Sequence, residues 1–302
     1  MTSILTNVAA MAALQTLRGI SSNLQDTQNR VSSGYRVEKA ADNAAYWSIA
    51  TTMRSDNKAL SAVSDALGLG AAKVDTAYTA MDNAIDVVSE IKSKIVAATE
   101  KGVDKTKIQE EISQLQAQLM SISQSASFSG ENWVAGNTTK SVVSTFVRDG
   151  NGNVSVKTTD YVLNAASNGN VLFGMTTTGT IDSSTGIIGS SNGTIGSIYT
   201  MNITSFGQTE IAMALTAIES GLEAMTKAAS QLGSISNRIE LQENFVAALG
   251  DSIDSGVGRL VDADMEEESS RLTALQTQQQ LAIQSLSIAN SSAQNVLTLF
   301  RS

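Results

Sequence analysis

Apolar residues recur at every seventh position in three separate stretches of the chain. A seven-residue repeat places an apolar seam along one side of an α-helix, and such a seam is buried only against another helix. The three series are Leu60, Leu67, Val74, Met81, Val88 and Ile95; Ile108, Leu115 and Ile122; and Ile211, Ile218, Met225, Leu232, Ile239, Val246 and Ile253.

The stretch between the second and the third series lacks this spacing over roughly 70 residues. The pattern therefore predicts helices at both ends of the chain and an interruption in the middle. We expect a mainly α fold: a long antiparallel coiled coil or helical bundle formed by both chain ends, with a small β-rich central insert.

The first half of the chain is expected to be helical throughout. Residues 1 to 43 indicate a helix whose run breaks near Ser32, Ser33 and Gly34. Residues 44 to 99 indicate a long second helix. A turn at 101–104 precedes a shorter antiparallel partner at 105 to 126, because its glycine can end one helix and its aspartate can cap the next.

From Gly136 to about Ser205, Thr, Ser, Asn and Gly dominate. A disordered linker is one interpretation of this segment. We favour a small β-rich insert, because apolar residues recur in strand-sized packets and residues 149–153 have the composition of a hairpin turn. The packets are Val142–Val143, Phe146–Val147, Val154–Val156, Tyr161–Leu163 and Val171–Phe173.

The last part of the chain is expected to return to helix. Residues 206 to 254 indicate a helix about 70 Å long at 1.5 Å per residue. After Gly256 and Gly258, a final helix is expected from about Asp262 to the end of the sequence. Its seam alternates steps of three and four through Leu272, Leu275, Gln279, Ala282, Leu286, Ala289, Ala293, Val296 and Phe300.

These elements predict three parts. Residues 1–43 and 262–302 form a terminal helical domain, residues 44–135 and 206–261 form an inner helical bundle, and residues 136–205 form the variable β-rich insert. The simplest function of the inner seams is to hold one molecule together. The terminal helices differ, because residues 1–17 and 272–300 carry no charge. Their polar but uncharged surfaces favour burial against other copies, since paired amides and hydroxyls are buried at less cost than charges.

Composition excludes several classes of function. The 302 residues contain no Cys, no His and no Pro. Disulfides, thiolate metal sites and Cys nucleophiles are therefore excluded, and the commonest general base and metal ligand is missing. The absence of proline suits long uninterrupted helices. We expect no enzyme activity, no cofactor and no metal.

Charge and hydropathy exclude other partners. The net charge is −9, so a basic surface for nucleic acid is not expected. No secretory signal is legible, because the first basic residue, Arg18, follows the apolar run at 1–17 instead of preceding it. The amide-rich stretch at 272–300 is too polar for a membrane span, so membrane insertion is not expected either.

Motifs at both ends of the sequence resemble those of bacterial flagellins. The first is Arg30–Arg36 with the sequence RVSSGYR, followed by Ala40, Asp42, Ala44, Ala45 and Ile49; Phe128–Gly130 occupies the place of the family's Phe-Asn-Gly. The resemblance covers roughly the first 135 and the last 100 residues. The C-terminal motif consists of Asp262–Asp264, Glu268, Leu272, Gln276, Gln279–Gln280 and Gln294–Leu299.

Some positions depart from the family pattern. Tyr46–Trp47 replaces a Gly-Leu pair, Ala293 stands where many members have proline, and the insert is short. We interpret these as features of the compact flagellins of rhizobial and other alphaproteobacteria.

The resemblance implies a structural subunit of the bacterial flagellar filament. It implies export in an unfolded state through the flagellar type III apparatus, polymerisation into an extracellular helical tube for swimming motility, and terminal helices that become ordered on assembly. The expected partners are further copies of the chain, co-assembling flagellins, an export chaperone, and cap and hook-associated proteins. A hook–filament junction protein is the alternative, and the complete C-terminal motif favours flagellin over it.

We expect seam residues of the terminal helices to lie at subunit interfaces, together with three charged residues that cluster where the first seam breaks. The expected interface residues are Leu14, Leu17, Leu24, Arg30, Val31, Arg36, Asp42, Leu272, Leu275, Ala282, Leu286, Ala289, Val296, Leu297 and Phe300.

The resemblance also points to a region that an innate immune receptor of animals recognises in many flagellins. That region corresponds here to Val87, Glu90, Ile91 and Glu111. Val87 stands where recognised flagellins usually carry arginine, so a bidentate donor is missing and we expect weak activation of the receptor.

An enzyme grafted into the insert is the rival of a different class. Metallopeptidase inserts need the two histidines of a His-Glu-x-x-His motif, which this chain lacks. Asp149, Asp160 and Asp182 are isolated among turn residues, where aspartate is expected for its local hydrogen bonds.

Overall fold

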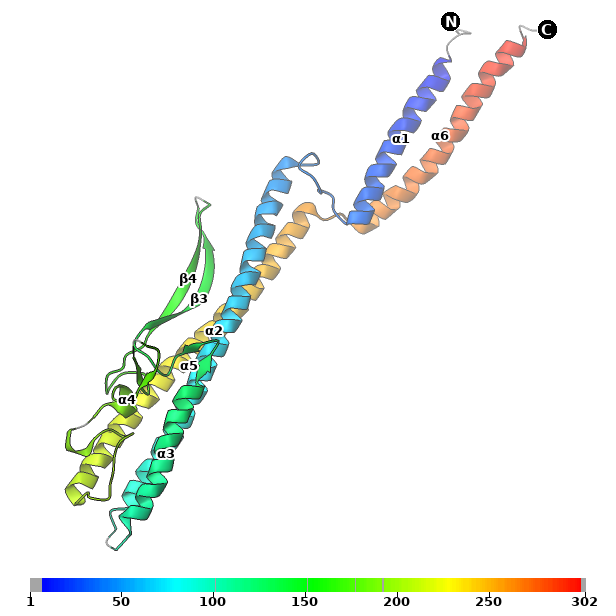
Figure 1. Cartoon of the computed structure of the whole chain (residues 1–302). Helices are drawn as coiled ribbons and strands as arrows, with labels where there is room; N and C mark the ends of the chain where they lie inside the picture. The colour runs from blue at the N-terminus through cyan, green and yellow to red at the C-terminus, as the bar shows by residue number, and fades with distance from the viewer. Residues whose placement is uncertain (1–6, 101, 151, 177, 192, 300–302) are drawn as a thin grey trace. The chain divides into compact units, whose positions relative to one another are not determined.

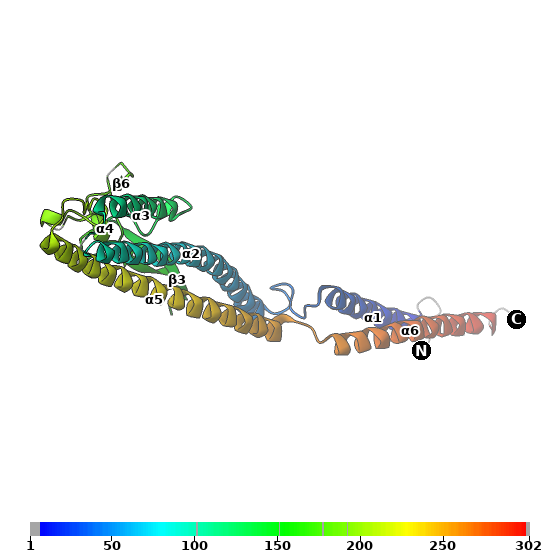
Figure 2. The ribbon, with the colours of Figure 1, turned by 90° about the horizontal axis from the view of Figure 1, so that it is seen from below.

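The structure is a computed structural model, and it describes residues 7–100, 102–150, 152–176, 178–191 and 193–299 (Figures 1 and 2). Only the backbone is described for residues 194 and 292–299. The described chain is mainly helical, with short antiparallel strands in the middle, as the seven-residue pattern predicts. Its contacts divide it into two compact units: residues 1–57 with 251–302, and residues 58–250.

Four long helices and one shorter one account for most of the chain. They are α1 (Val8–Ser33), α2 (Ala44–Ala97), α3 (Lys105–Ser125), α5 (Gln208–Val261) and α6 (Met265–Leu299). A short helix, α4 (Gly186–Gly189), and a 3₁₀ turn (Gly193–Ile195) lie in the insert. The strands are β1 (Ser127–Phe128), β2 (Glu131–Asn132), β3 (Thr139–Arg148), β4 (Val154–Val162), β5 (Gly174–Met175) and β6 (Ile181–Asp182).

In the unit of residues 58–250, the two long heptad series form the core. Every seam residue of α2 from Leu60 to Ile95 is buried, and so is every seam residue of α5 from Ile211 to Val246. In α3 the buried positions are Ile112, Gln116, Leu119 and Ser123, whereas the expected seam residues Ile108, Leu115 and Ile122 are only half-buried. The expected helix at 105–126 is therefore confirmed, but its buried face is rotated, so that the expected seam residues flank the buried stripe.

The turn before α3 confirms that a glycine ends one helix and an aspartate caps the next. Gly102 has a φ of 98°, which favours glycine, and the Asp104 side chain accepts a hydrogen bond from the Thr106 amide at 3.0 Å.

Two glutamines of α3 form hydrogen bonds with the backbone at the C-terminal end of the insert. The side chain of Gln116 donates to the carbonyl oxygens of Ile198 and Met201, both at 3.0 Å. Gln109 accepts from the Ile203 amide at 2.8 Å. Since this part of the insert has no strand partner, these amides satisfy backbone groups that burial would otherwise leave unpaired.

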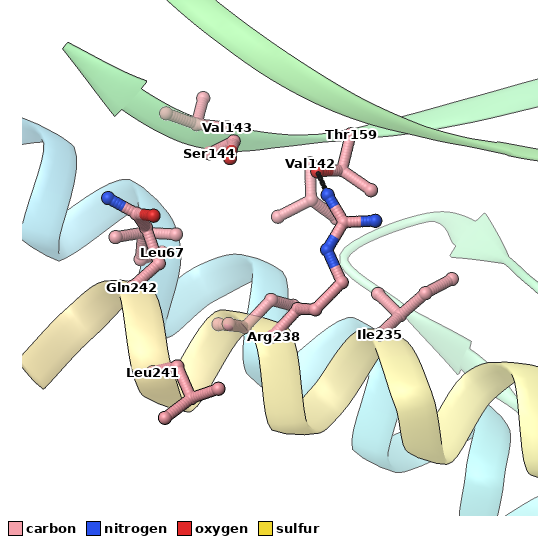
Figure 3. Close-up of a pocket in the computed structure, with 10 residues that line it drawn as sticks. Leu67, Val142, Val143, Ser144, Thr159, Ile235, Arg238, Leu241 and Gln242 are labelled. Atoms are coloured by element: carbon pink, nitrogen blue, oxygen red, sulfur yellow. Dashed lines mark hydrogen bonds between the residues drawn. The ribbon is translucent and has the colours of Figure 1, made fainter.

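The insert contains a β3–β4 hairpin that packs on the helices of the same unit. Val142 of β3 sits directly over Gly70 of α2, where a Cβ would come within 2.2 Å of a Val142 methyl. The Arg238 side chain reaches from α5 to the Thr159 hydroxyl of β4 at 2.9 Å, beside a hollow of about 230 Å³ (Figure 3). Tyr161 stacks on the buried Trp133 with ring centres 6.0 Å apart, and burial raises the pKa of Tyr161 to about 12.

The expected strand at Val171–Phe173 is wrong. These residues are fully buried, but only Phe173 forms an isolated bridge, to Ala135. The Leu172 amide donates to Val134 at 2.8 Å, and the Ile187 amide donates to Val171 at 3.0 Å. The apolar packet therefore marks the core beneath α4. The other expected packets lie in β3 and β4, except that β4 ends at Val162 and leaves out Leu163.

In the unit of residues 1–57 and 251–302, α1 and α6 run antiparallel and side by side (Figures 1 and 2). The Asn7 side chain caps α1 by accepting from the Ala10 amide at 3.0 Å. The helix ends at Ser33, where Gly34 has a φ of 74°, so the expectation of helix through residue 43 is wrong and the predicted break near Gly34 is confirmed.

The expected helix end near residue 254 is also wrong, because α5 continues through Gly256 and Gly258 to Val261. Interior glycines cost about 1 kcal/mol each in a helix. That cost is offset here by packing: Val257 and Val261 are buried in a cluster with Val37 and Ala50.

Candidate subunit interface

The α1–α6 pair is joined near both of its ends. The Asn7 side chain donates to the Ala289 carbonyl at 3.0 Å. At the other end, an Arg30 guanidinium nitrogen lies 3.2 Å from a Glu268 carboxylate oxygen. These two contacts fix the register of the two helices.

Most of the expected interface residues lie along this helix–helix contact. Leu275 is buried and Leu14 is exposed at 38%. The side chains of Val296 and Leu297, and all of Phe300, lie outside the described residues. The half-buried members are Leu17, Leu24, Arg30, Val31, Leu272, Ala282, Leu286 and Ala289.

Pairing of α1 with α6 leaves another set of large apolar side chains exposed. They lie on both helices, and their exposed fractions exceed one half. Single exposed apolar residues are ordinary, but several on one pair of helices mark an interaction surface. The seam spacing missed them because they lie off the three–four pattern; they are Val8, Met11, Leu281, Ile283 and Ile288.

A hollow of about 450 Å³ lies between the two helices on one side. Small and apolar side chains such as Ala13, Ile20 and Ala282 line it. Thr16, Gln278 and Ser285 also line it, and none of its lining residues is charged, so the hollow suits an apolar or uncharged side chain from another molecule better than a charged ligand.

Glu268 is the centre of the charged cluster in this unit. Its side chain is only 7% exposed, and its Oε1 accepts from Arg30 at 3.2 Å and from Arg271 at 3.1 Å. Its Oε2 is buried without a hydrogen-bond partner among the described residues. Sequence reasoning noted Glu268 within a motif but did not expect it to pair with Arg30, since 238 residues separate the two.

Arg36 and Asp42 have separate local roles. Arg36 donates to the Leu260 carbonyl at 3.0 Å. Asp42 accepts from the backbone amides of Lys39 at 2.9 Å and Glu38 at 3.0 Å. These two hydrogen bonds, that from Lys39 first, hold the pKa of Asp42 below its usual value of 3.8. The structure therefore places the three charged residues near the end of α1 without pairing them with one another.

Asp42→Ala should impair assembly or change filament shape, because it removes the acceptor that orders the turn between α1 and α2. The contribution of Asp42 is present above its ordinary pKa and is lost as the pH falls through its lowered folded-state pKa. Electron microscopy of the variant at neutral pH checks this. Filaments of normal length and waveform would contradict it, and Asp42→Asn, which keeps an acceptor oxygen, serves as the control.

The residues of the expected receptor region divide into two groups. Val87 and Ile91 are buried at 6% and 1% exposure, and they face the core of their unit. Glu90 and Glu111 are exposed. Glu111 pairs with Lys94 at 2.6 Å, and this hydrogen bond raises the pKa of Lys94.

Two of the three aspartates of the insert act in turns, whereas Asp160 lies in β4, so the expectation that it stands among turn residues is wrong. Asp149 accepts from the Asn153 amide at 2.8 Å. Asp182 accepts from the Ser184 amide at 2.9 Å, and hydrogen bonds from Ser184 lower the pKa of Asp182. Within the described part of the chain, no group of three or more Asp and Glu residues is placed to hold a metal ion, and no helix is both long and apolar enough to span a membrane.

Comparisons with known proteins agree with this architecture. Residues 4–139 match the bacterial flagellin N-terminal helical region, and residues 215–300 match the bacterial flagellin C-terminal helical region. The chain is 54% identical to Flagellin C of Rhizobium meliloti strain 1021 over 322 residues, with 100% of both chains covered. It is 44% identical to a flagellin of Brucella melitensis biotype 1 over 307 residues, again with full coverage of both.

A third relative differs from the chain in length. The chain is 49% identical to Flagellin A of Rhizobium meliloti over an alignment of 398 residues that covers 100% of both. Because this alignment is longer than the chain, Flagellin A contains residues that the chain lacks. With both terminal regions matched and full-length relatives near half identity, the chain belongs to the bacterial flagellin family.

Proposed function

We propose that the chain is a structural subunit of the bacterial flagellar filament and that it polymerises through the outward faces of the α1–α6 pair. The observation that carries this proposal is the set of large apolar side chains that stay exposed after α1 and α6 have packed together. Burying one leucine or isoleucine contributes about 1.5–3 kcal/mol, so a few such residues can drive assembly.

The filament is an extracellular appendage built from many copies. Export in an unfolded state by the flagellar type III apparatus fits a chain without cysteine or proline, since neither disulfides nor proline isomerisation slow its refolding. We further propose an export chaperone, cap and hook-associated proteins, and co-assembling flagellins as partners, and no enzyme activity. The flagellin relatives do not favour a hook–filament junction protein.

The test is electron microscopy of the purified chain under polymerising conditions, which should give long filaments. Leu281→Asp and Ile288→Asp should each raise the critical concentration at least about tenfold, because each places a charge in a buried contact. Val154→Asp, at a residue of similar exposure on β4, is the matched control. Failure of the wild-type chain to form filaments would overturn the function, and wild-type behaviour of both α6 variants would overturn the interface.

Receptor activation by the monomer is expected to be weak. Val87 supplies no bidentate donor, and its burial keeps it from the surface. A reporter-cell assay with purified monomer measures this. Signalling as strong as that of an arginine-bearing flagellin would contradict the expectation.

A further inference from the structure

The α1–α6 pair has two unlike sides. One side contains the hollow of about 450 Å³, whose wall includes Thr16 of α1 and Leu281 of α6. Leu14 and Ile283 each stand two residues away from one of these wall residues. Since two residues turn an α-helix by about 200°, Leu14 and Ile283 point to the side of the pair opposite the hollow.

Apolar side chains protrude from that opposite side. Leu14 is 38% exposed and Ile283 is 53% exposed. The Asn7–Ala289 hydrogen bond sets the level of the two helices. Leu14 lies seven residues after the first of these residues and Ile283 lies six residues before the second, so both reach nearly the same level.

A third apolar side chain extends this row along α6. Met265 is 44% exposed, and it lies 18 residues, or about five turns, from Ile283, so it stands on the same side of the helix. We call Leu14, Ile283 and Met265 the ridge. The ridge and the hollow belong to one compact unit.

The hollow suits an uncharged, apolar occupant. None of its lining residues is charged, so a charged segment would lose hydration there without gaining an ion pair. An apolar side chain that enters instead displaces water from Leu281, which is 58% exposed, and gains dispersion contacts. The ridge has this character, but it cannot reach the hollow of its own molecule, because α1 and α6 lie between them. A second copy can supply it.

We propose that the ridge of one copy packs into the hollow side of the α1–α6 pair of the next copy. This inference rests on the proposed function, since it states which two sides of the pair meet in the filament. The contact joins two different surfaces, so each copy keeps one free ridge or one free hollow at the end of a growing row. Contacts of this kind that do not close generate a helical filament. A twofold pairing of hollow against hollow would leave the void unfilled.

A charge on either side tests the contact. Ile283→Asp on the ridge and Ser285→Asp in the wall of the hollow should each raise the critical concentration for polymerisation at least about tenfold, because each places a charge in an uncharged contact. Both positions are exposed, so the fold of the monomer should not change. Val154→Asp on β4 is again the control. If both variants polymerise like this control while the wild-type chain forms filaments, the contact is wrong and the function stands.

Disulfide crosslinking tests which sides meet. The chain has no cysteine, so Ser285→Cys combined with Ile283→Cys introduces the only two thiols, on opposite sides of α6. Oxidised filaments of this variant, or of Ser285→Cys combined with Met265→Cys, should give a ladder of covalent oligomers, whereas oxidised monomer should give none. The first pair reports neighbours at the same level, and the second reports neighbours shifted by about 30 Å along α6.

The single-cysteine variants are the controls. Filaments of Ser285→Cys alone, or of Ile283→Cys alone, should give no crosslinked product, because a contact between unlike sides does not bring two identical positions together. Wild-type filaments combined with ladders from neither double variant would overturn the contact. Crosslinked dimers from a single-cysteine variant would overturn it as well, since they would show like sides meeting.

Discussion

Replacing Gly186 with alanine should unfold the core of the insert. Gly186 has a φ of 93°, and an added Cβ would lie 2.5 Å from the Leu172 carbonyl oxygen and 2.6 Å from the Phe173 Cα. These neighbours are backbone atoms of the buried segment under α4, so no side chain can move aside. Left-handed strain costs about 1–2 kcal/mol and overpacking about 1–3 kcal/mol more, for an expected loss near 4 kcal/mol.

Fluorescence of Trp133 is the measurement, because this tryptophan is buried in the same core. Trp47→Phe removes the second tryptophan from the background. Gly152→Ala is the matched control, since Gly152 also has a positive φ of 86° but has no atom within 4 Å of the added Cβ. Equal losses in the two variants would show that the clash at Gly186 is relieved by a backbone shift.

The sequence was most informative where a single period extends over many residues. In α2 and α5, the seam residues pack against other helices, so an apolar residue at a seam position correctly predicts a buried side chain. The period in α3 was too short to separate Ile108 and Leu115 from the truly buried Ile112 and Leu119. Both stripes contain apolar residues, and the buried one also contains Gln116 and Ser123, so the positions of the neighbouring elements determine which stripe is buried.

Other features depend on contacts that local rules cannot supply. Gly256 and Gly258 have the composition of a helix end, but burial of Val257 and Val261 beside them keeps α5 intact. Val171–Phe173 has the composition of a strand, yet its backbone pairs with a loop and with α4. In the α1–α6 pair, Leu275 of the expected seam is buried and the other described seam side chains are half-buried, except for Leu14, which is exposed. The residues left outside, such as Leu281 and Ile288, become visible only once that pair has formed.

Glu268→Ala should weaken the filament more than the loss of any other charged side chain in the α1–α6 pair. The substitution removes the buried acceptor that Arg30 and Arg271 share; Arg30 then loses this ion pair, whereas Arg271 keeps its pair with Glu267. Breaking a buried ion pair costs about 3–5 kcal/mol. Arg30 and Arg271 are 36% and 46% exposed, so solvent screening reduces the expected loss to about 1–3 kcal/mol per subunit.

The depolymerisation temperature and the critical concentration of the filament report this loss. Glu267→Ala is the matched control, because Glu267 is 66% exposed and its ion pair among the described residues is with Arg271, at a spacing of four residues worth about 0.3–0.5 kcal/mol. Glu268→Gln should fall between the two, since it keeps one acceptor oxygen but loses the charge and adds a donor where Oε2 lacks a partner. If Glu268→Ala and Glu267→Ala weaken the filament equally, the contact between Arg30 and Glu268 does not hold α1 to α6. In that case the register of the pair must come from the apolar seam and the Asn7–Ala289 hydrogen bond alone.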